Sequence, residues 1–94
     1  MTIKLDRKPE GCKLLRVEID IDGEILRAVK VRGDFFAHPE ELFEAAESDL
    51  AGLPIAGLYD AALRAFSRKG LSLYGATAEA IAIVITDACA SATA

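Results

Sequence analysis

The sequence predicts an α+β domain of two layers, in which an antiparallel meander of about three strands packs against about three helices. Three observations lead to this expectation. Hydrophobic and charged residues alternate through much of the first third of the chain, which is typical of strands with one buried face. Hydrophobic residues then recur at helical spacing in most of the remainder. The 94 residues are enough for one hydrophobic core, so we expect residues 1–94 to form a single domain in the order β-β-β-α-α-α.

The first two strands are expected at Thr2–Arg7 and Leu14–Ile21, connected by a turn at Pro9-Glu10-Gly11. From Leu15 onward the odd-numbered residues of the second strand are hydrophobic and the residues between them are charged. This period of two places one row of side chains in the core and the other in solvent. The two segments are therefore predicted to pair and to share one buried face.

The third strand is predicted at Ile25–Arg32, where the odd positions are hydrophobic except for Arg27. A two-residue Asp-Gly loop would pair odd positions of one strand with even positions of the next and would separate the two hydrophobic rows. We therefore expect a three-residue loop, Ile21-Asp22-Gly23, with Gly23 in the left-handed conformation.

The first helix is predicted to begin at Pro39, because proline suits the first helical position. Gly52 and Pro54 are expected to end it. The residues expected on its buried side are Leu42, Phe43, Ala46 and Leu50. The residues expected on its solvated side are Glu40, Glu44 and Glu47. The pattern is typical of a helix that covers a sheet.

Two further helices are expected at about Ile55–Phe66 and at Ala78–Ala88. The residues that they are expected to bury are Leu58, Ala62 and Phe66 in the first, and Ile81, Ile85 and Ala88 in the second. The β-branched residues within 80–86 also suit a strand, but alanines on both sides and an N-cap at Thr77 favour a helix. Ser91–Ala94 are expected to be frayed.

The bulk composition argues against several classes of function. The sequence has eleven lysines and arginines and fifteen acidic residues, and the resulting net charge of −4 disfavours a nucleic-acid or anionic-membrane binder. The longest apolar run, Ala80–Ile85, is far shorter than the roughly 20 residues that span a bilayer. The N-terminal residues carry charges where a signal peptide would be apolar. We expect a cytoplasmic protein, with Cys12 and Cys89 as reduced thiols.

The sequence contains no recognisable catalytic constellation and no metal site. His38 is the single histidine and precedes Pro39, so it is interpreted as a residue at the start of the helix. The two cysteines and one histidine cannot supply the four ligands of a zinc site. The glycines form neither nucleotide-binding motif, GxGxxG or GxxxxGK[ST]. The glutamates at positions 40, 41, 44 and 47 are interpreted as a solvated helix face rather than as metal ligands.

The charges are unevenly distributed along the chain. Residues 1–33 contain eight lysines and arginines against six acidic residues, whereas residues 34–63 contain seven acidic residues and neither lysine nor arginine. Two solvated faces would explain this distribution. Alternatively, the basic strands face an anion or an acidic partner.

The most distinctive segment runs from Val31 to Glu40 and contains Gly33-Asp34-Phe35-Phe36 between a strand and a helix. Adjacent side chains of an extended chain point in opposite directions. If one phenylalanine enters the core, the other faces outward and suggests a docking surface. The alternative, with both rings under the first helix, is equally compatible with the pattern.

This segment, with its surroundings, resembles a known family. Residues 13–25, 29–36 and 39–42 look like the C-terminal accessory domain of lipoate–protein ligases, which in some organisms is a separate small protein. The resemblance runs from about Pro9 to Phe66 and more loosely to the last helix. Gly-Asp-Phe-Phe between a hairpin and a Pro-Glu helix start is its most specific part. The alanine-rich residues 76–94 depart from the family pattern.

The resemblance implies a subunit of a two-component enzyme. In that family the pocket for lipoate and ATP lies in the large domain, which this chain lacks, so the chain alone would bind no cofactor and carry no catalytic residue. The small subunit would partner the catalytic large subunit, and lipoyl-acceptor domains only indirectly. It would be required to activate lipoate as lipoyl-AMP, with ATP and Mg in the complex, and would be dispensable for transfer to the acceptor lysine.

The resemblance also selects site residues. Gly33, Asp34, Phe35 and Phe36 are signature positions, and Lys13 lies in the matching strand. Our hypothesis is that Lys13 or Arg16 reaches toward phosphate across the interface, while Phe35 or Phe36 docks on the large subunit.

Two other functional classes compete with this interpretation. The accessory domain has a fold similar to sulfur-transfer and iron–sulfur scaffold proteins, so a sulfur acceptor using Cys12 is the principal alternative. Cys12 lies between Lys8 and Lys13, which favours a reactive thiolate. A scaffold is a weaker alternative because a cluster requires several thiolates. A regulatory interaction module without a ligase partner is the third possibility.

Overall fold

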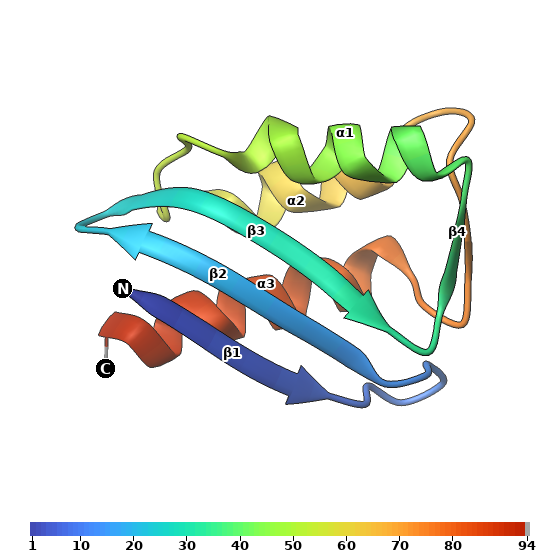
Figure 1. Cartoon of the computed structure of the whole chain (residues 1–94), viewed down its shortest axis with the longest axis horizontal. Helices are drawn as coiled ribbons and strands as arrows, with labels where there is room; N and C mark the ends of the chain where they lie inside the picture. The colour runs from blue at the N-terminus through green and yellow to red at the C-terminus, as the bar shows by residue number, and fades with distance from the viewer. Residues whose placement is uncertain (94) are drawn as a thin grey trace.

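The computed structural model describes residues 1–93 and shows an α+β fold of two layers (Figure 1). The elements in chain order are β1 (Thr2–Arg7), β2 (Leu15–Asp22), β3 (Ile25–Gly33), β4 (Phe36–His38), α1 (Glu40–Leu50), α2 (Leu58–Phe66), β5 (Ser72–Tyr74) and α3 (Ala78–Thr93). The first three strands form an antiparallel meander in the order β1-β2-β3, as predicted. A second sheet, the antiparallel pair β4–β5, was not predicted.

Figure 1 views the meander from the face that no helix covers. Helix α3 crosses behind β1 and β2 and packs on both, whereas α1 packs on β3 and α2 packs between α1 and α3. The strict alternation of β2 confirms the predicted period of two. Its buried residues are Leu15, Val17, Ile19 and Ile21.

The predicted three-residue loop between β2 and β3 is wrong. Asp22 pairs with Ile25, so the turn has two residues, Gly23 and Glu24. Gly23 has a φ of +63°, the left-handed conformation that was expected, and glycine at the first central position is typical of type II′ hairpin turns.

A β-bulge, rather than a longer loop, keeps one hydrophobic face across the hairpin. The register shifts where Asp20 pairs with Ala28 and Ile21 pairs with Leu26, which leaves Arg27 as the extra residue. A bulge changes which side of the strand is buried, so Leu26 and Val29 both enter the core. Arg27, the exception in the sequence pattern, thus marks the bulge.

Helix α1 begins at Glu40, with Pro39 in the N-cap position rather than in the first helical position. Phe43, Ala46 and Leu50 are buried as predicted, and Leu42 is half-buried. Glu47 was predicted to face solvent, and this is wrong: it is 8% exposed.

Helix α2 begins at Leu58, three residues later than predicted, because the chain before it is attached to the β2–β3 hairpin. Pro54 forms an antiparallel bridge with Ile25, and the N–H of Ile55 donates to the carbonyl of Glu24 at 2.8 Å. These contacts hold residues 54–55 against the hairpin. The predicted buried residues of the helix, Leu58, Ala62 and Phe66, are confirmed.

Residues 80–86 are helical, so the strand alternative for this segment is excluded. The N–H of Ala80 donates to the hydroxyl Oγ1 of Thr77 at 3.1 Å, which confirms the predicted cap. Ile81 and Ile85 are buried as expected, and so is Ala88. The helix continues to Thr93, so the expectation that residues 91–93 are frayed is wrong; Ala94 lies outside the described residues.

One continuous core connects the elements. Phe66 is its largest fully buried residue, and its ring centroid lies 5.1 Å from that of Phe43. Within residues 1–93, no helix has the length and hydrophobicity needed to cross a membrane.

Candidate interaction site at the strand–helix junction

Three segments that are distant in sequence meet at one end of the molecule. The N–H of Lys13 donates to the carbonyl of Gly75 at 2.7 Å, and the N–H of Asp34 donates to the carbonyl of Leu14 at 3.0 Å. Phe36 pairs with Tyr74 across β4 and β5. We call this group the junction; it consists of residues 13–14, 33–36 and 74–75. It contains five of the six predicted site residues: Lys13, Gly33, Asp34, Phe35 and Phe36.

Gly33 is required at the junction by a close approach of two backbones. It has a φ of +146°, and a Cβ atom at this position would lie 2.0 Å from the carbonyl oxygen of Leu14. That oxygen accepts the hydrogen bond from Asp34, so it cannot move away without losing a junction contact. No larger residue fits at position 33 without displacing the chain.

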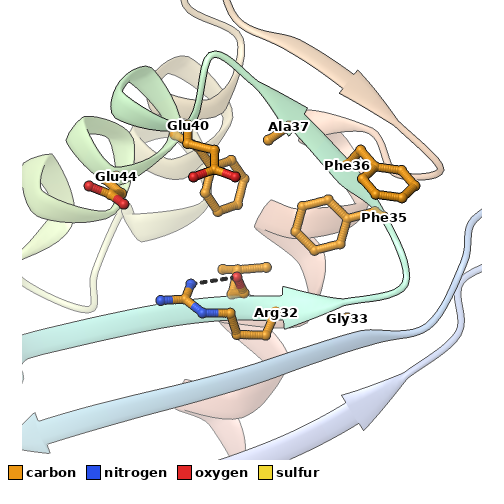
Figure 2. Close-up of a pocket in the computed structure, with 9 residues that line it drawn as sticks. Arg32, Gly33, Phe35, Phe36, Ala37, Glu40 and Glu44 are labelled. Atoms are coloured by element: carbon orange, nitrogen blue, oxygen red, sulfur yellow. Dashed lines mark hydrogen bonds between the residues drawn. The ribbon is translucent and has the colours of Figure 1, made fainter.

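The two phenylalanines of the junction point in opposite directions. Phe35 is half-buried, and its ring centroid is 5.5 Å from that of Phe43. Phe36 is 75% exposed. Figure 2 shows Phe35 directed toward α1 and Phe36 on the other side of β4. The alternative with both rings under the helix is therefore excluded.

Lys13 lies against the end of β5. A Cβ atom on Gly75 would be 2.9 Å from Cγ of Lys13 and 3.5 Å from Cα of Phe35. The stem of the lysine thus passes over Gly75 beside Phe35, while the residue as a whole is exposed. This arrangement carries a positive charge at the edge of the junction.

Arg16, the sixth predicted residue, lies outside the junction on the open face of the sheet. Its side chain is 64% exposed, and its Nε atom is 4.0 Å from Oδ2 of Asp6. Its cross-strand neighbours are Asp6 on β1 and Arg32 on β3. The next row of this face is Lys4, Glu18 and Lys30. The two rows mix four basic with two acidic residues, as on a solvated face with a small positive excess.

A cleft of about 310 Å³ separates the end of β3 and β4 from the first turns of α1 (Figure 2). Its apolar walls include Phe35 and Phe43, and its rim carries Glu40 and Glu44. Arg32 is the only cation among the lining residues that the structure describes. Its Nη1 atom donates to the carbonyl of Val31 at 2.8 Å and to Oε2 of Glu47 at 3.1 Å.

Glu47 joins α1 to the edge of the sheet. Besides Arg32, its Oε2 atom accepts a hydrogen bond of 2.7 Å from the backbone N–H of Val31. Val31 lies on β3, an edge strand, so this N–H has no strand partner on its outer side. Sequence reasoning missed this residue, although a signal existed. Glu47 follows Phe43 by four residues and precedes Leu50 by three, which places it on the buried side of the helix.

The two cysteines and the histidine do not form a reactive site in the structure. Cys12 is buried and forms no disulfide, and its backbone N–H donates to the carbonyl of Pro9 at 2.9 Å. Cys89 is also buried, and burial raises the pKa of its thiol. A buried thiol does not suit the exposed persulfide acceptor of the alternative hypothesis. His38 is exposed and pairs with Ser72. No three His, Cys, Asp or Glu side chains within the described part of the chain are placed to hold a metal ion.

Comparisons with known proteins agree with the ligase interpretation and do not favour the sulfur-acceptor alternative. No family model matches the chain. Lipoate-protein ligase A subunit 2 of Thermoplasma acidophilum is 33% identical over 66 residues, which are 70% of this chain and 69% of that protein. A solved chain from a structural analysis of an archaeal lipoylation system matches with a TM-score of 0.73 and 27% identity. That system comprises a bipartite lipoate protein ligase and its E2 lipoyl domain from Thermoplasma acidophilum.

The structural match covers 90% of this chain and 97% of the solved chain, so it includes both the meander and the helices. Fold and sequence thus point to the same relatives, and the chain belongs to the family of lipoate–protein ligase A subunit 2.

Proposed function

We propose that the chain is the accessory subunit of a two-part lipoate–protein ligase and is needed for the ATP-dependent activation of lipoate to lipoyl-AMP. The observation that carries this proposal is the match over 97% of a chain from a bipartite lipoate protein ligase. The structure adds a physical reason. Within the described residues, the cleft beside β4 and a second one on the open sheet face between Lys4 and Lys30 are both open to solvent, so we assign the acyl adenylate to the partner subunit.

Activation joins the lipoate carboxylate to the α-phosphate of ATP and releases pyrophosphate. Negative charge develops around phosphorus in this step, so placed cations and exclusion of water accelerate it. Lys13, exposed beside Gly75, and Arg16, on the open sheet face, are the cations that we assign to this role. ATP and lipoate belong to the catalytic subunit in this proposal. Mg²⁺, which is bound together with the phosphates of ATP, belongs there too in this proposal.

The transfer of the lipoyl group to the acceptor lysine has a different structural requirement. Attack of the acceptor lysine on lipoyl-AMP needs access to the adenylate, which a covering subunit would hinder. In line with the family resemblance, we propose that the chain is required for activation and dispensable for transfer. The cytoplasm, where ATP is available, is the compartment that the proposal assigns to the complex.

Reconstitution with purified subunits tests both steps. The catalytic subunit of the same organism is incubated with lipoate and ATP, with and without the chain, and lipoyl-AMP and pyrophosphate are measured. A parallel reaction supplies preformed lipoyl-AMP and an acceptor lipoyl domain. We expect activation only when both subunits are present and transfer in either case. Activation at the same rate without the chain would refute the proposal, as would activation by the chain alone.

A further inference from the structure

The outer side of the β4–β5 ribbon carries two exposed aromatic rings that face solvent together. Phe36 is 75% exposed and Tyr74 is 60% exposed, and the two residues are direct cross-strand partners. Direct partners project from the same face of a ribbon. Ala37 and Leu73 project from the opposite face and are half-buried against the core. The ribbon is therefore anchored by its inner face and presents an aromatic pair on its outer face.

This aromatic pair contributes little to the stability of the isolated chain, because neither ring is buried. Apart from Met1, Phe36 and Tyr74 are the two most exposed large hydrophobic residues of the part that the structure describes. Phenylalanine and tyrosine are enriched in the centres of protein interfaces, where they bury a large area at small cost in side-chain entropy. Exposed apolar surface of this kind indicates an interaction site.

The charges beside the pair restrict what can bind there. Glu40 and Glu44 lie four residues apart on α1 and border the cleft that Phe36 also lines. Like charges at this spacing repel each other. The cation of the cleft, Arg32, is already engaged by Glu47, and residues 34–63 supply no other. A cation from outside the chain would relieve this repulsion.

The size and lining of the cleft fit a long basic side chain. Its volume is about 310 Å³, and the rings of Phe35 and Phe43 form apolar walls. The methylene stem of a lysine or arginine packs on such walls, while its charged end remains near carboxylates at the rim. The surface thus combines an aromatic anchor with an acceptor for one basic side chain.

We propose that the aromatic pair Phe36–Tyr74 and the adjoining cleft form the surface on which the catalytic subunit docks. The catalytic subunit would offer an apolar depression for the two rings and a lysine or arginine side chain for the cleft at Glu40 and Glu44. This proposal rests on the proposed function for the identity of the partner, and on the exposure and charge of the ribbon for the place. Phe35, the other docking candidate, packs against Phe43 and would meet the partner only as a wall of the cleft.

The role of the aromatic pair in docking is tested by the affinity of the chain for the catalytic subunit, measured by calorimetric titration. We expect the double variant Phe36→Ala/Tyr74→Ala to raise the dissociation constant at least tenfold, and the chain concentration for half-maximal lipoate activation to rise by the same factor. The matched control is Tyr59→Ala/Ile83→Ala, which removes exposed hydrophobic side chains from α2 and α3. It should change the dissociation constant less than twofold.

The proposed contact between a basic side chain of the catalytic subunit and the cleft is tested with the double variant Glu40→Gln/Glu44→Gln. We expect weaker binding and a smaller loss of affinity between low and high salt, because one screened ion pair is removed. The control, Glu79→Gln/Asp87→Asn, removes the same charge from α3 and should leave the salt dependence unchanged. Equal effects of the two acidic variants would refute a specific basic contact in the cleft.

The outcomes separate this proposal from the proposed function. If the wild-type chain binds and activates the catalytic subunit, but the aromatic double variant binds with unchanged affinity, the docking surface is wrong and the function stands. If the wild-type chain neither binds nor activates, the function itself is wrong. Sedimentation of the chain alone completes the test. A dimer that the aromatic double variant abolishes, without an effect on binding to the catalytic subunit, would assign the surface to self-association and overturn the proposal.

Discussion

Main-chain contacts, rather than side-chain contacts, hold Lys13 and Gly33 in place. Lys13 is attached through its N–H to the carbonyl of Gly75, and Gly33 is enclosed by the carbonyl of Leu14. The ammonium group of Lys13 forms no hydrogen bond or ion pair within the described residues. Its side chain can therefore be removed without disturbing the backbone of the junction.

The variant Lys13→Ala tests the cationic role of this side chain. If Lys13 stabilises the charge that develops on phosphate, the rate of lipoyl-AMP formation at saturating chain should fall by about tenfold to a hundredfold. The rate is measured as pyrophosphate release with the catalytic subunit. Transfer from preformed lipoyl-AMP should be unaffected.

Arg27→Ala is the control for this variant. It removes the same charge from the other end of β3, roughly 20 Å from Gly33 along the strand. We expect it to activate at the wild-type rate. A Lys13→Ala chain that also supports the wild-type rate would exclude the cationic role of this residue.

Among the elements, α1 and β3 share the hydrophobic core and are also joined by one carboxylate. Glu47 accepts hydrogen bonds from the backbone N–H of Val31 and from Arg32. The Arg32 side chain is 62% exposed, so solvent screens this ion pair and the backbone hydrogen bond is the stronger contribution. The same contact protects the outer edge of β3 from pairing with another strand.

We predict that Glu47→Leu lowers the free energy of unfolding by about 2–3 kcal/mol, because it leaves the buried N–H of Val31 without an acceptor. Glu47→Gln retains an oxygen acceptor and should cost about 1 kcal/mol. Urea denaturation followed by far-ultraviolet circular dichroism measures both values. Glu44→Gln, at an exposed position of the same helix, should change stability by less than about 0.5 kcal/mol. Equal stabilities of the Glu47→Leu and Glu44→Gln variants would contradict this account.

The whole molecule shares one core, in which Phe66 contacts Phe43 of α1 and is 1% exposed. Helix α2 packs against α1 on one side and α3 on the other, and α3 packs on β1 and β2. A small domain connected in this way is expected to unfold in one cooperative step. The β4–β5 ribbon is included, because Ala37 and Leu73 pack against the same core.

We therefore predict a single unfolding transition. The two tyrosines report on α2 and β5, since the chain contains no tryptophan. The urea midpoint from tyrosine fluorescence should coincide with that from circular dichroism. Phe66→Ala should lower the free energy of unfolding by about 3–5 kcal/mol and should shift both midpoints together.

Phe36→Ala makes the same chemical change at an exposed position and should cost less than about 0.5 kcal/mol. This comparison also establishes whether the docking variants are folded. An earlier fluorescence transition than the circular dichroism transition would show that the ribbon unfolds separately from the core.

Patterns within one element were predictable from the sequence. Three examples are the alternation of β2, the buried residues of α2 and the cap at Thr77. Each depends on residues that are only a few positions apart in the sequence. The family resemblance rested on the segment around Gly33-Asp34-Phe35-Phe36, and the comparisons with known proteins confirm the family. Residues 80–86 were ambiguous because β-branched side chains suit both a strand and a buried helix, and only the packing of α3 against both the sheet and α2 separates the two.

The sequence by itself determined the fold class, the order of the predicted elements and the family, because periodicity and local motifs encode them. Only the tertiary structure decided three other features: the hydrogen bond of Glu47 to the edge of β3, the bulge at Arg27 and the pairing of Phe36 with Tyr74. Each of these depends on which backbone groups and side chains of two different elements meet. A buried carboxylate needs a particular strand edge beside it, and an exposed aromatic pair needs two strands that are separated by two helices.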